Sequence, residues 1–149
     1  MITLICGRIG CGKTTYAQSL PGEKLSIDKV MLERYPPYLG DDFERISNMV
    51  RDELLETAAR IDGDVVLDWG FHHRADRDDT IRYFRERGKE VRLLWMDIPE
   101  EELQRRRDWR NAHLPPDCYY IDENLARKCD SRFEPPMPDE DYIKIAYQE

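Results

Sequence analysis

Apolar residues occur along this chain in two kinds of block, and together they predict strands that alternate with helices. Short, nearly continuous apolar runs over residues 1–6, 65–68 and 90–97 are typical of strands buried in a sheet. Between the first two runs, apolar residues at helical spacing predict an amphipathic helix over 43–61 that ends before Gly63. This order predicts an α/β fold, a mostly parallel sheet with helices on both faces.

Weaker patterns predict the remaining elements. Residues 24–28 read as a short strand that ends on Asp28, and the two prolines at 36 and 37 exclude a regular element through that point. Alternating apolar residues over 143–147 predict a fifth strand. Further helices are predicted over 13–20, from about 75 to 88, from 99 to the prolines at 115 and 116, and over 121–129.

The sequence GRIGCGKT at residues 7–14 matches the phosphate-loop motif G-x-x-x-x-G-K-[ST], and it lies between a predicted strand and a predicted helix. Its glycines let the backbone approach a phosphate without a Cβ in the way. The amides then converge on the anion at the start of the helix, where the helix dipole favours negative charge. The predicted nucleotide-binding residues are Gly7, Arg8, Ile9, Gly10, Cys11, Gly12, Lys13, Thr14 and Thr15.

Aspartates follow the predicted strands at the edge where ligands gather in parallel sheets. Lys13 is expected to reach the β- and γ-phosphates, and the Thr14 hydroxyl to ligate Mg²⁺. Asp68 fits a water-mediated Mg²⁺ ligand or a contact to a phosphoryl acceptor, and the alternative is a buried cap of the following loop. Asp28 can accept the proton of an acceptor hydroxyl. The alternatives for Asp28 are a cap on the next segment or a Mg²⁺ ligand through water.

An arginine-rich segment follows Pro99. Arg106 and Arg110 stand four residues apart and share one face of the predicted helix, which can fold over ATP as a lid. Arginines so placed stabilise charge on a transferring phosphoryl group. The alternative is a solvated helix whose arginines pair with the acidic residues at 100–102.

Aromatic and cationic residues lie near the predicted acceptor side. A cationic cluster just past Asp68 can bind an anionic substrate or simply cap the helix that follows. The cluster consists of His72, His73, Arg74 and Arg77. Some of the aromatic residues are expected in an acceptor pocket and others in the core. The tentative substrate-binding residues are Asp28, Tyr35, Tyr38, Trp69, His72, Arg74 and Arg77.

Composition limits the class of protein further. The chain has 149 residues, enough for one domain, and no apolar run approaches the length of a membrane span. A net charge of −8 disfavours non-specific binding to nucleic acid. The N-terminus lacks a targeting pattern and the four cysteines show no zinc spacing, so we expect a cytoplasmic protein with reduced thiols.

The chain resembles the small P-loop kinases of the zeta-toxin, chloramphenicol phosphotransferase and polynucleotide kinase type. More closely, it resembles compact bacterial ATP-binding proteins often called AAA family ATPases. The resemblance covers nearly the whole chain and rests on these segments: GRIGCGKT, LSID, VVLDWGFHHRADR, RRRDWRN and FEPPMPDE.

This resemblance implies a P-loop NTPase three-layer fold of five strands, a single domain over 1–149 and a short helical lid at about 99–130. It also implies that Asp28 is the acceptor base. Polynucleotide kinases carry an arginine three residues after this aspartate, where this chain has Met31. Trp69 replaces the glutamate that hydrolytic motors place after the strand-ending aspartate, which counts against an ATP-driven machine.

The sequence therefore predicts an ATP- and Mg²⁺-dependent kinase that acts on a hydroxyl of a small molecule. A nucleic-acid end kinase is a second interpretation, in which nucleic acid is a less favoured partner. A nucleotide-binding regulatory switch with little turnover is a third. Neither a membrane partner nor a particular oligomeric state is indicated.

Overall fold

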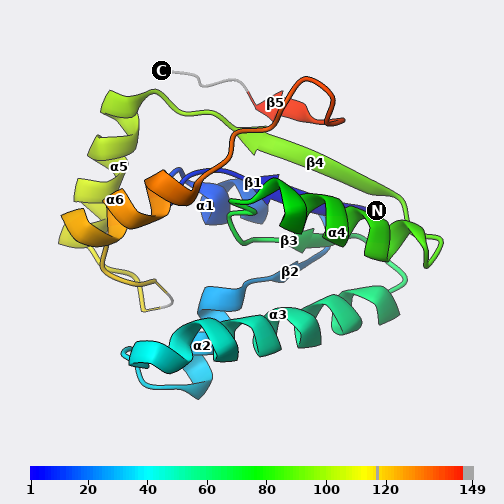
Figure 1. The fold of residues 1–149 in the computed structure, drawn as a ribbon, viewed down its shortest axis with the longest axis horizontal. Helices are drawn as coiled ribbons and strands as arrows, with labels where there is room; N and C mark the ends of the chain where they lie inside the picture. Colours follow the sequence, from blue (N-terminus) through cyan, green and yellow to red (C-terminus); the bar gives the residue numbers. More distant parts are fainter. Residues whose placement is uncertain (117, 146–149) are drawn as a thin grey trace.

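Five strands form one parallel sheet in the order β2–β3–β1–β4–β5 (Figure 1). The computed structural model describes residues 1–116 and 118–145. The central strand, β1, is buried along its whole length because it pairs with β3 on one side and β4 on the other. The strands span Ile2–Cys6 (β1), Glu23–Leu25 (β2), Val65–Leu67 (β3), Val91–Met96 (β4) and Ile143–Ile145 (β5).

Helices cover both faces of the sheet, because side chains alternate between the faces along each strand. Leu4 packs on one face against α3 and α4, whereas Ile5 packs on the other against α1 and α5. The predicted three-layer α/β fold is confirmed. The helices span Lys13–Gln18 (α1), Ile27–Arg34 (α2), Phe43–Arg60 (α3), Arg74–Arg85 (α4), Glu100–Ala112 (α5) and Glu123–Arg132 (α6), with a 3₁₀ turn η1 at Gly40–Asp42.

The segment around Asp28 differs from the prediction. Strand β2 ends at Leu25, and Asp28 lies in the first turn of α2 instead of at the end of a strand. Ser26 explains the change, since its side chain accepts a hydrogen bond from the Lys29 amide at 3.3 Å and caps the helix. The helix then ends at Arg34, before the two prolines.

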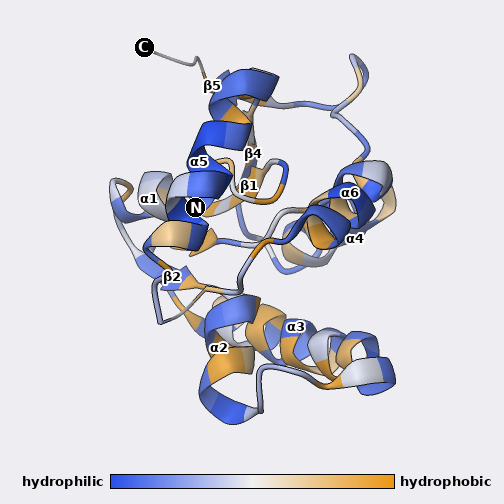
Figure 2. Cartoon of the chain, turned by 90° about the vertical axis from the view of Figure 1, so that its left-hand side faces the viewer, coloured by the Kyte–Doolittle hydropathy of each residue, from blue (hydrophilic) through white to orange (hydrophobic). Residues whose placement is uncertain are grey.

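Smaller differences concern the C-terminal third. Helix α6 begins later than predicted because Asp122 caps it by accepting a hydrogen bond from the Leu125 amide at 2.7 Å. The fifth strand is confirmed over Ile143–Ile145, while Tyr147 lies outside the described residues. Within the described ranges, none of the helices combines the length and apolarity that crossing a membrane requires. Figure 2 colours most of α5 as hydrophilic, in keeping with its many arginines and glutamates.

Candidate nucleotide and phosphoryl-transfer site

The phosphate loop connects the end of β1 to the start of α1. Gly10 and Gly12 have φ angles of 80° and 97°, which side-chain-bearing residues rarely adopt. A Cβ on Gly7 would lie 2.6 Å from the Cys11 sulfur, so this position has no room for a side chain. The glycines of the motif are therefore required by backbone conformation and by close packing.

Gly70, which sequence reasoning did not single out, supports the base of the loop. The Gly7 amide donates to the Gly70 carbonyl at 3.2 Å. A Cβ on Gly70 would lie 2.2 Å from Nε2 of His72, so the imidazole lies directly against this glycine. The position of Gly70, two residues after a strand-ending aspartate, is the signal that could have identified it.

Thr14 and Asp68 meet where a metal is expected. The Thr14 hydroxyl donates to Oδ2 of Asp68 at 2.7 Å, and Asp68 is buried whereas Thr14 is exposed. A hydroxyl and a carboxylate are hard oxygen ligands that suit Mg²⁺, which usually takes few protein ligands and completes its shell with phosphate and water. Within the described part of the chain, no three His, Cys, Asp or Glu side chains cluster to hold a metal by themselves. The residues present fit a Mg²⁺ ion that is bound together with phosphates.

Asp28 is electrostatically coupled to the phosphate loop. Its carboxyl is open to solvent but lies among protein groups that displace much of its hydration. This partial desolvation raises the pKa of Asp28, while the positive charges of Lys13 and Arg110 lower it and Asp68 raises it further. The Asp28 carboxyl thus lies within electrostatic range of a phosphate-loop lysine, of an arginine of α5 and of Asp68.

Helix α5 lies against the outer side of the phosphate loop. A Cβ on Gly12 would lie 2.8 Å from Nη1 of Arg106, and one on Gly10 would lie 2.8 Å from Cγ of Arg107. Arg106 donates to the Cys11 carbonyl, and Nε of Arg107 donates to the Ile9 carbonyl at 2.8 Å. Sequence reasoning selected Arg106 as a lid residue, and the structure places its side chain against the phosphate loop. It did not select Arg107, since three consecutive arginines give no signal of which one is buried.

Arg110 lies one turn further along α5, on the side of Asp28. Its Nη2 donates to the Tyr119 carbonyl at 2.7 Å, and its buried Nε has no hydrogen-bond partner among the described residues. The Tyr119 ring meets the ring of Phe43 edge to face, with centroids 6.2 Å apart. The segment after α5 therefore contacts the start of α3 across the mouth of the site, and Tyr119 is a site residue that the sequence pattern did not indicate.

Two of the tentative substrate residues, Trp69 and His72, line a groove of about 440 Å³ between α3 and α4. Burial, together with the nearby charge of Lys13, lowers the pKa of His72 to about 4, so its imidazole is neutral at pH 7. Tyr35 packs partly buried against the apolar cluster of α2 and α3. Tyr38 is 86% exposed and lies outside this groove.

The structure engages both Arg74 and Arg77, the two arginines predicted to bind substrate, in ion pairs. Arg77 is completely buried and forms an ion pair with Glu140, with Nε to Oε1 at 2.8 Å. It also donates to the Phe71 carbonyl at 2.8 Å and so holds a residue whose φ of 47° is unusual outside glycine. Arg74 pairs with carboxylates on the surface. Both arginines fix the C-terminal segment to α4, because Arg74 pairs with Asp139 as well as with Asp78 of its own helix, and Arg77 pairs with Glu140.

Comparisons with known proteins agree with this fold. The model of a family described as "AAA domain" matches residues 2–136. A search among curated proteins finds no match. Among solved structures, Kti12 from Chaetomium thermophilum, in complex with ADP-AlF3, superposes with a TM-score of 0.73 at 14% identity and covers 99% of this chain and 89% of its own.

Two further structures have the same fold. A gluconokinase from Sinorhizobium meliloti 1021 gives a TM-score of 0.64 at 18% identity, covering 96% of this chain and 80% of its own. A chain of the Pnkp1/Rnl/Hen1 RNA repair complex superposes with a TM-score of 0.67 at 21% identity, and the match covers 88% of this chain and 43% of that chain. The resemblance to P-loop kinase-like proteins predicted from the sequence is confirmed at the level of fold.

Proposed function

Since the chain belongs to the AAA-domain family whose model matches residues 2–136, and has a P-loop kinase-like fold, we propose that it is a kinase that uses ATP and Mg²⁺. It transfers the γ-phosphoryl group to a hydroxyl of a small molecule, and we expect it to act in the cytoplasm. The observation that carries this proposal is the contact of the phosphate-loop Thr14 hydroxyl with Asp68 at 2.7 Å, beside a loop whose glycines have the φ angles that the motif needs. The nearby charges of Lys13 and Arg110, which act on Asp28, support it.

Each group has one step in the proposed transfer. Lys13 and the loop amides bind the β- and γ-phosphates, and Thr14 with Asp68 holds Mg²⁺, which neutralises phosphate charge when bound. Arg106 and Arg110 balance the charge that develops between donor and acceptor. The acceptor oxygen attacks phosphorus, its proton passes to Asp28, and the bond to the ADP oxygen breaks.

The groove that Trp69 and His72 line has the size of a small-molecule site, and we take it as the candidate acceptor side. The groove beside Trp69 and His72 measures about 440 Å³, within the usual range for small-molecule sites. Met31, at the position where polynucleotide kinases carry a phosphate-binding arginine, has 0% exposure and belongs to the core. A nucleic-acid 5′ end would therefore lack that contact.

The test is a screen of ATP consumption against pools of metabolites, nucleosides and oligonucleotides, followed by Asp28→Asn with the acceptor found. We expect ATP to bind nearly as in the wild type and transfer to fall by about a hundredfold or more, the scale of a positioned general base. Asp62→Asn is the matched control, because it makes the same chemical change at an exposed position before β3, at the opposite end of that strand from Asp68.

The outcomes separate the alternatives. Transfer at the wild-type rate in Asp28→Asn would refute the assigned base. Weaker ATP binding that excess Mg²⁺ restores would make Asp28 a metal ligand. Turnover with oligonucleotides alone would favour the end kinase, and ATP binding without acceptor-dependent turnover would favour a switch.

A further inference from the structure

The carbonyls of two phosphate-loop peptides are turned outward, toward α5. The Ile9 carbonyl accepts from Nε of Arg107 at 2.8 Å, and the Cys11 carbonyl accepts from Arg106. In a trans peptide the carbonyl and the following N–H point to opposite sides of the same rigid plane. Fixing the Ile9 carbonyl outward therefore fixes the Gly10 amide inward, toward the phosphate side of the loop.

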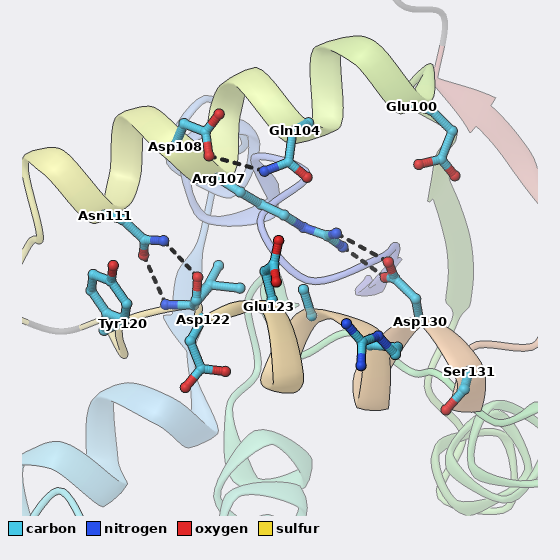
Figure 3. Close-up of a pocket in the computed structure, with 13 residues that line it drawn as sticks. Glu100, Gln104, Arg107, Asp108, Asn111, Tyr120, Asp122, Glu123, Asp130 and Ser131 are labelled. Atoms are coloured by element: carbon cyan, nitrogen blue, oxygen red, sulfur yellow. Dashed lines mark hydrogen bonds and ion pairs between the residues drawn. The ribbon is translucent and has the colours of Figure 1, made fainter.

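Arg107 connects the loop to α6 through a single guanidinium. Its side chain is 5% exposed, and it forms a two-pronged ion pair with Asp130, with Nη1 to Oδ2 at 3.0 Å and Nη2 to Oδ1 at 2.7 Å. Figure 3 shows the side chain crossing from α5 to Asp130 on α6, along one wall of a cleft of about 760 Å³. The orientation of this guanidinium therefore depends on Asp130.

Asp130 also binds an arginine of the loop itself. Arg8 donates from Nε at 3.2 Å and from Nη2 at 2.7 Å to the two oxygens of Asp130, and it pairs with Glu100 at the start of α5. The carboxylate thus accepts four hydrogen bonds from two arginines. Although burial opposes it, these bonds lower the pKa of Asp130 to about 2, so the group stays ionised at neutral pH.

We propose that Asp130 is a positioning residue for nucleotide binding, which acts through Arg107 and Arg8 to hold the peptide planes of the phosphate loop with their amides toward the phosphates. This inference rests on the nucleotide-binding part of the proposed function. It assigns to α6 a role in phosphate recognition although α6 contributes no residue to the phosphate-loop motif.

Simple electrostatics predicts the opposite effect, and this makes the proposal testable. Removing a negative charge near an anion site should strengthen ADP binding. If Asp130 positions the loop, Asp130→Asn instead weakens binding, because Arg107 can no longer be held against the Ile9 carbonyl. The two explanations thus predict opposite signs for the change in ADP affinity that Asp130→Asn causes.

The experiment is calorimetric titration of wild type and Asp130→Asn with ADP, with and without Mg²⁺, together with thermal unfolding. Asp108→Asn is the matched control, since Asp108 is an exposed acid that lines the same cleft and accepts a hydrogen bond from Gln104 at 2.9 Å. We expect at least a tenfold weaker affinity for Asp130→Asn under both conditions, and unchanged or slightly tighter binding for Asp108→Asn.

Unchanged or tighter ADP binding in folded Asp130→Asn would overturn the proposal, whatever happens to its melting temperature. If that variant does not fold, Arg107→Lys decides, because lysine keeps the charge but cannot bond the Ile9 carbonyl and both oxygens of Asp130. Wild-type affinity in Arg107→Lys would also overturn the proposal. Failure of the wild type to bind ADP would refute the proposed nucleotide binding itself, and the inference with it.

Discussion

Replacing Arg77 by methionine tests whether the buried ion pair with Glu140 holds the C-terminal segment on the core. The two side chains are 0% and 4% exposed, and Nε and Nη2 of Arg77 lie 2.8 and 3.0 Å from the Glu140 oxygens. Methionine fills much of the same space but leaves the Glu140 charge and the Phe71 carbonyl without their donor. Breaking a buried pair on one side costs about 3–5 kcal/mol.

The expected loss is large compared with the stability of a domain, about 5–15 kcal/mol. At about 2–4 °C per kcal/mol for a chain of this size, the midpoint of thermal unfolding should fall by roughly 6–20 °C. The assays are urea and thermal unfolding followed by circular dichroism. Replacing Arg77 and Glu140 together by apolar residues should recover much of the loss, because no unpaired charge then remains.

Arg74 provides a matched control on the same helix. It makes a two-pronged pair with Asp139, the neighbour of Glu140, but this pair lies at the surface, where ion pairs contribute little. If Arg77→Met lowers the free energy of unfolding no more than Arg74→Met does, then burial does not increase the contribution of the Arg77 pair to stability. That result would refute the reasoning.

The pH dependence of the free energy of unfolding is a second test of the Arg77–Glu140 pair. Burial alone would raise the pKa of Glu140, but the hydrogen bonds from Arg77 lower it below its ordinary value. A carboxyl with a depressed pKa in the folded state contributes stability above its unfolded pKa and loses it as pH falls through the folded pKa. The difference in unfolding free energy between wild type and Arg77→Met should therefore shrink in acid.

Three further predictions concern the site. Lys13→Ala should weaken ATP binding by about 1.5–3 kcal/mol, the value of a charged hydrogen bond, and unchanged affinity in calorimetry would contradict its role. Asp68→Asn should raise the Mg²⁺ concentration needed for half-maximal ATP binding but leave Mg²⁺-free ADP binding nearly as it was; an unchanged Mg²⁺ requirement would count against the metal site. Arg106→Ala and Arg110→Ala should each lower turnover more than they lower the melting temperature, and equal losses would mean that α5 is only structural.

The sequence was sufficient for elements that depend on local pattern. The apolar run before Gly7 and the spacing of the loop glycines predicted β1, the phosphate loop and α1 together. Each of these three elements is determined by residues that are neighbours in the sequence. Asp28, whose role stays a prediction, was wrongly assigned to a strand end. There the capping serine at 26 outweighed the apolar pattern around it.

Contacts between distant segments could not be predicted in this way. Arg77 and Glu140 are 63 residues apart, and Arg8 and Asp130 are 122 apart, so no spacing rule connects them. A surface cluster and a buried ion pair look alike in sequence, because burial is decided by packing of the whole fold. For the cationic cluster after Asp68, the sequence therefore left open a substrate site or a helix cap, whereas Arg77 of this cluster is buried in the core.

The order of strands also has a consequence for how this protein is made. Ile2 in β1 pairs with Val65 in β3 and with Val91 in β4, so β1 leaves the ribosome before either of the strands that it pairs with. At about 5–20 residues per second, synthesis of those partners takes roughly 5–20 s. During that interval β1 is an apolar segment with unpaired edges on the nascent chain, and chaperones can bind it there. A pause in translation before β3 and β4 are made would lengthen this exposure and promote aggregation.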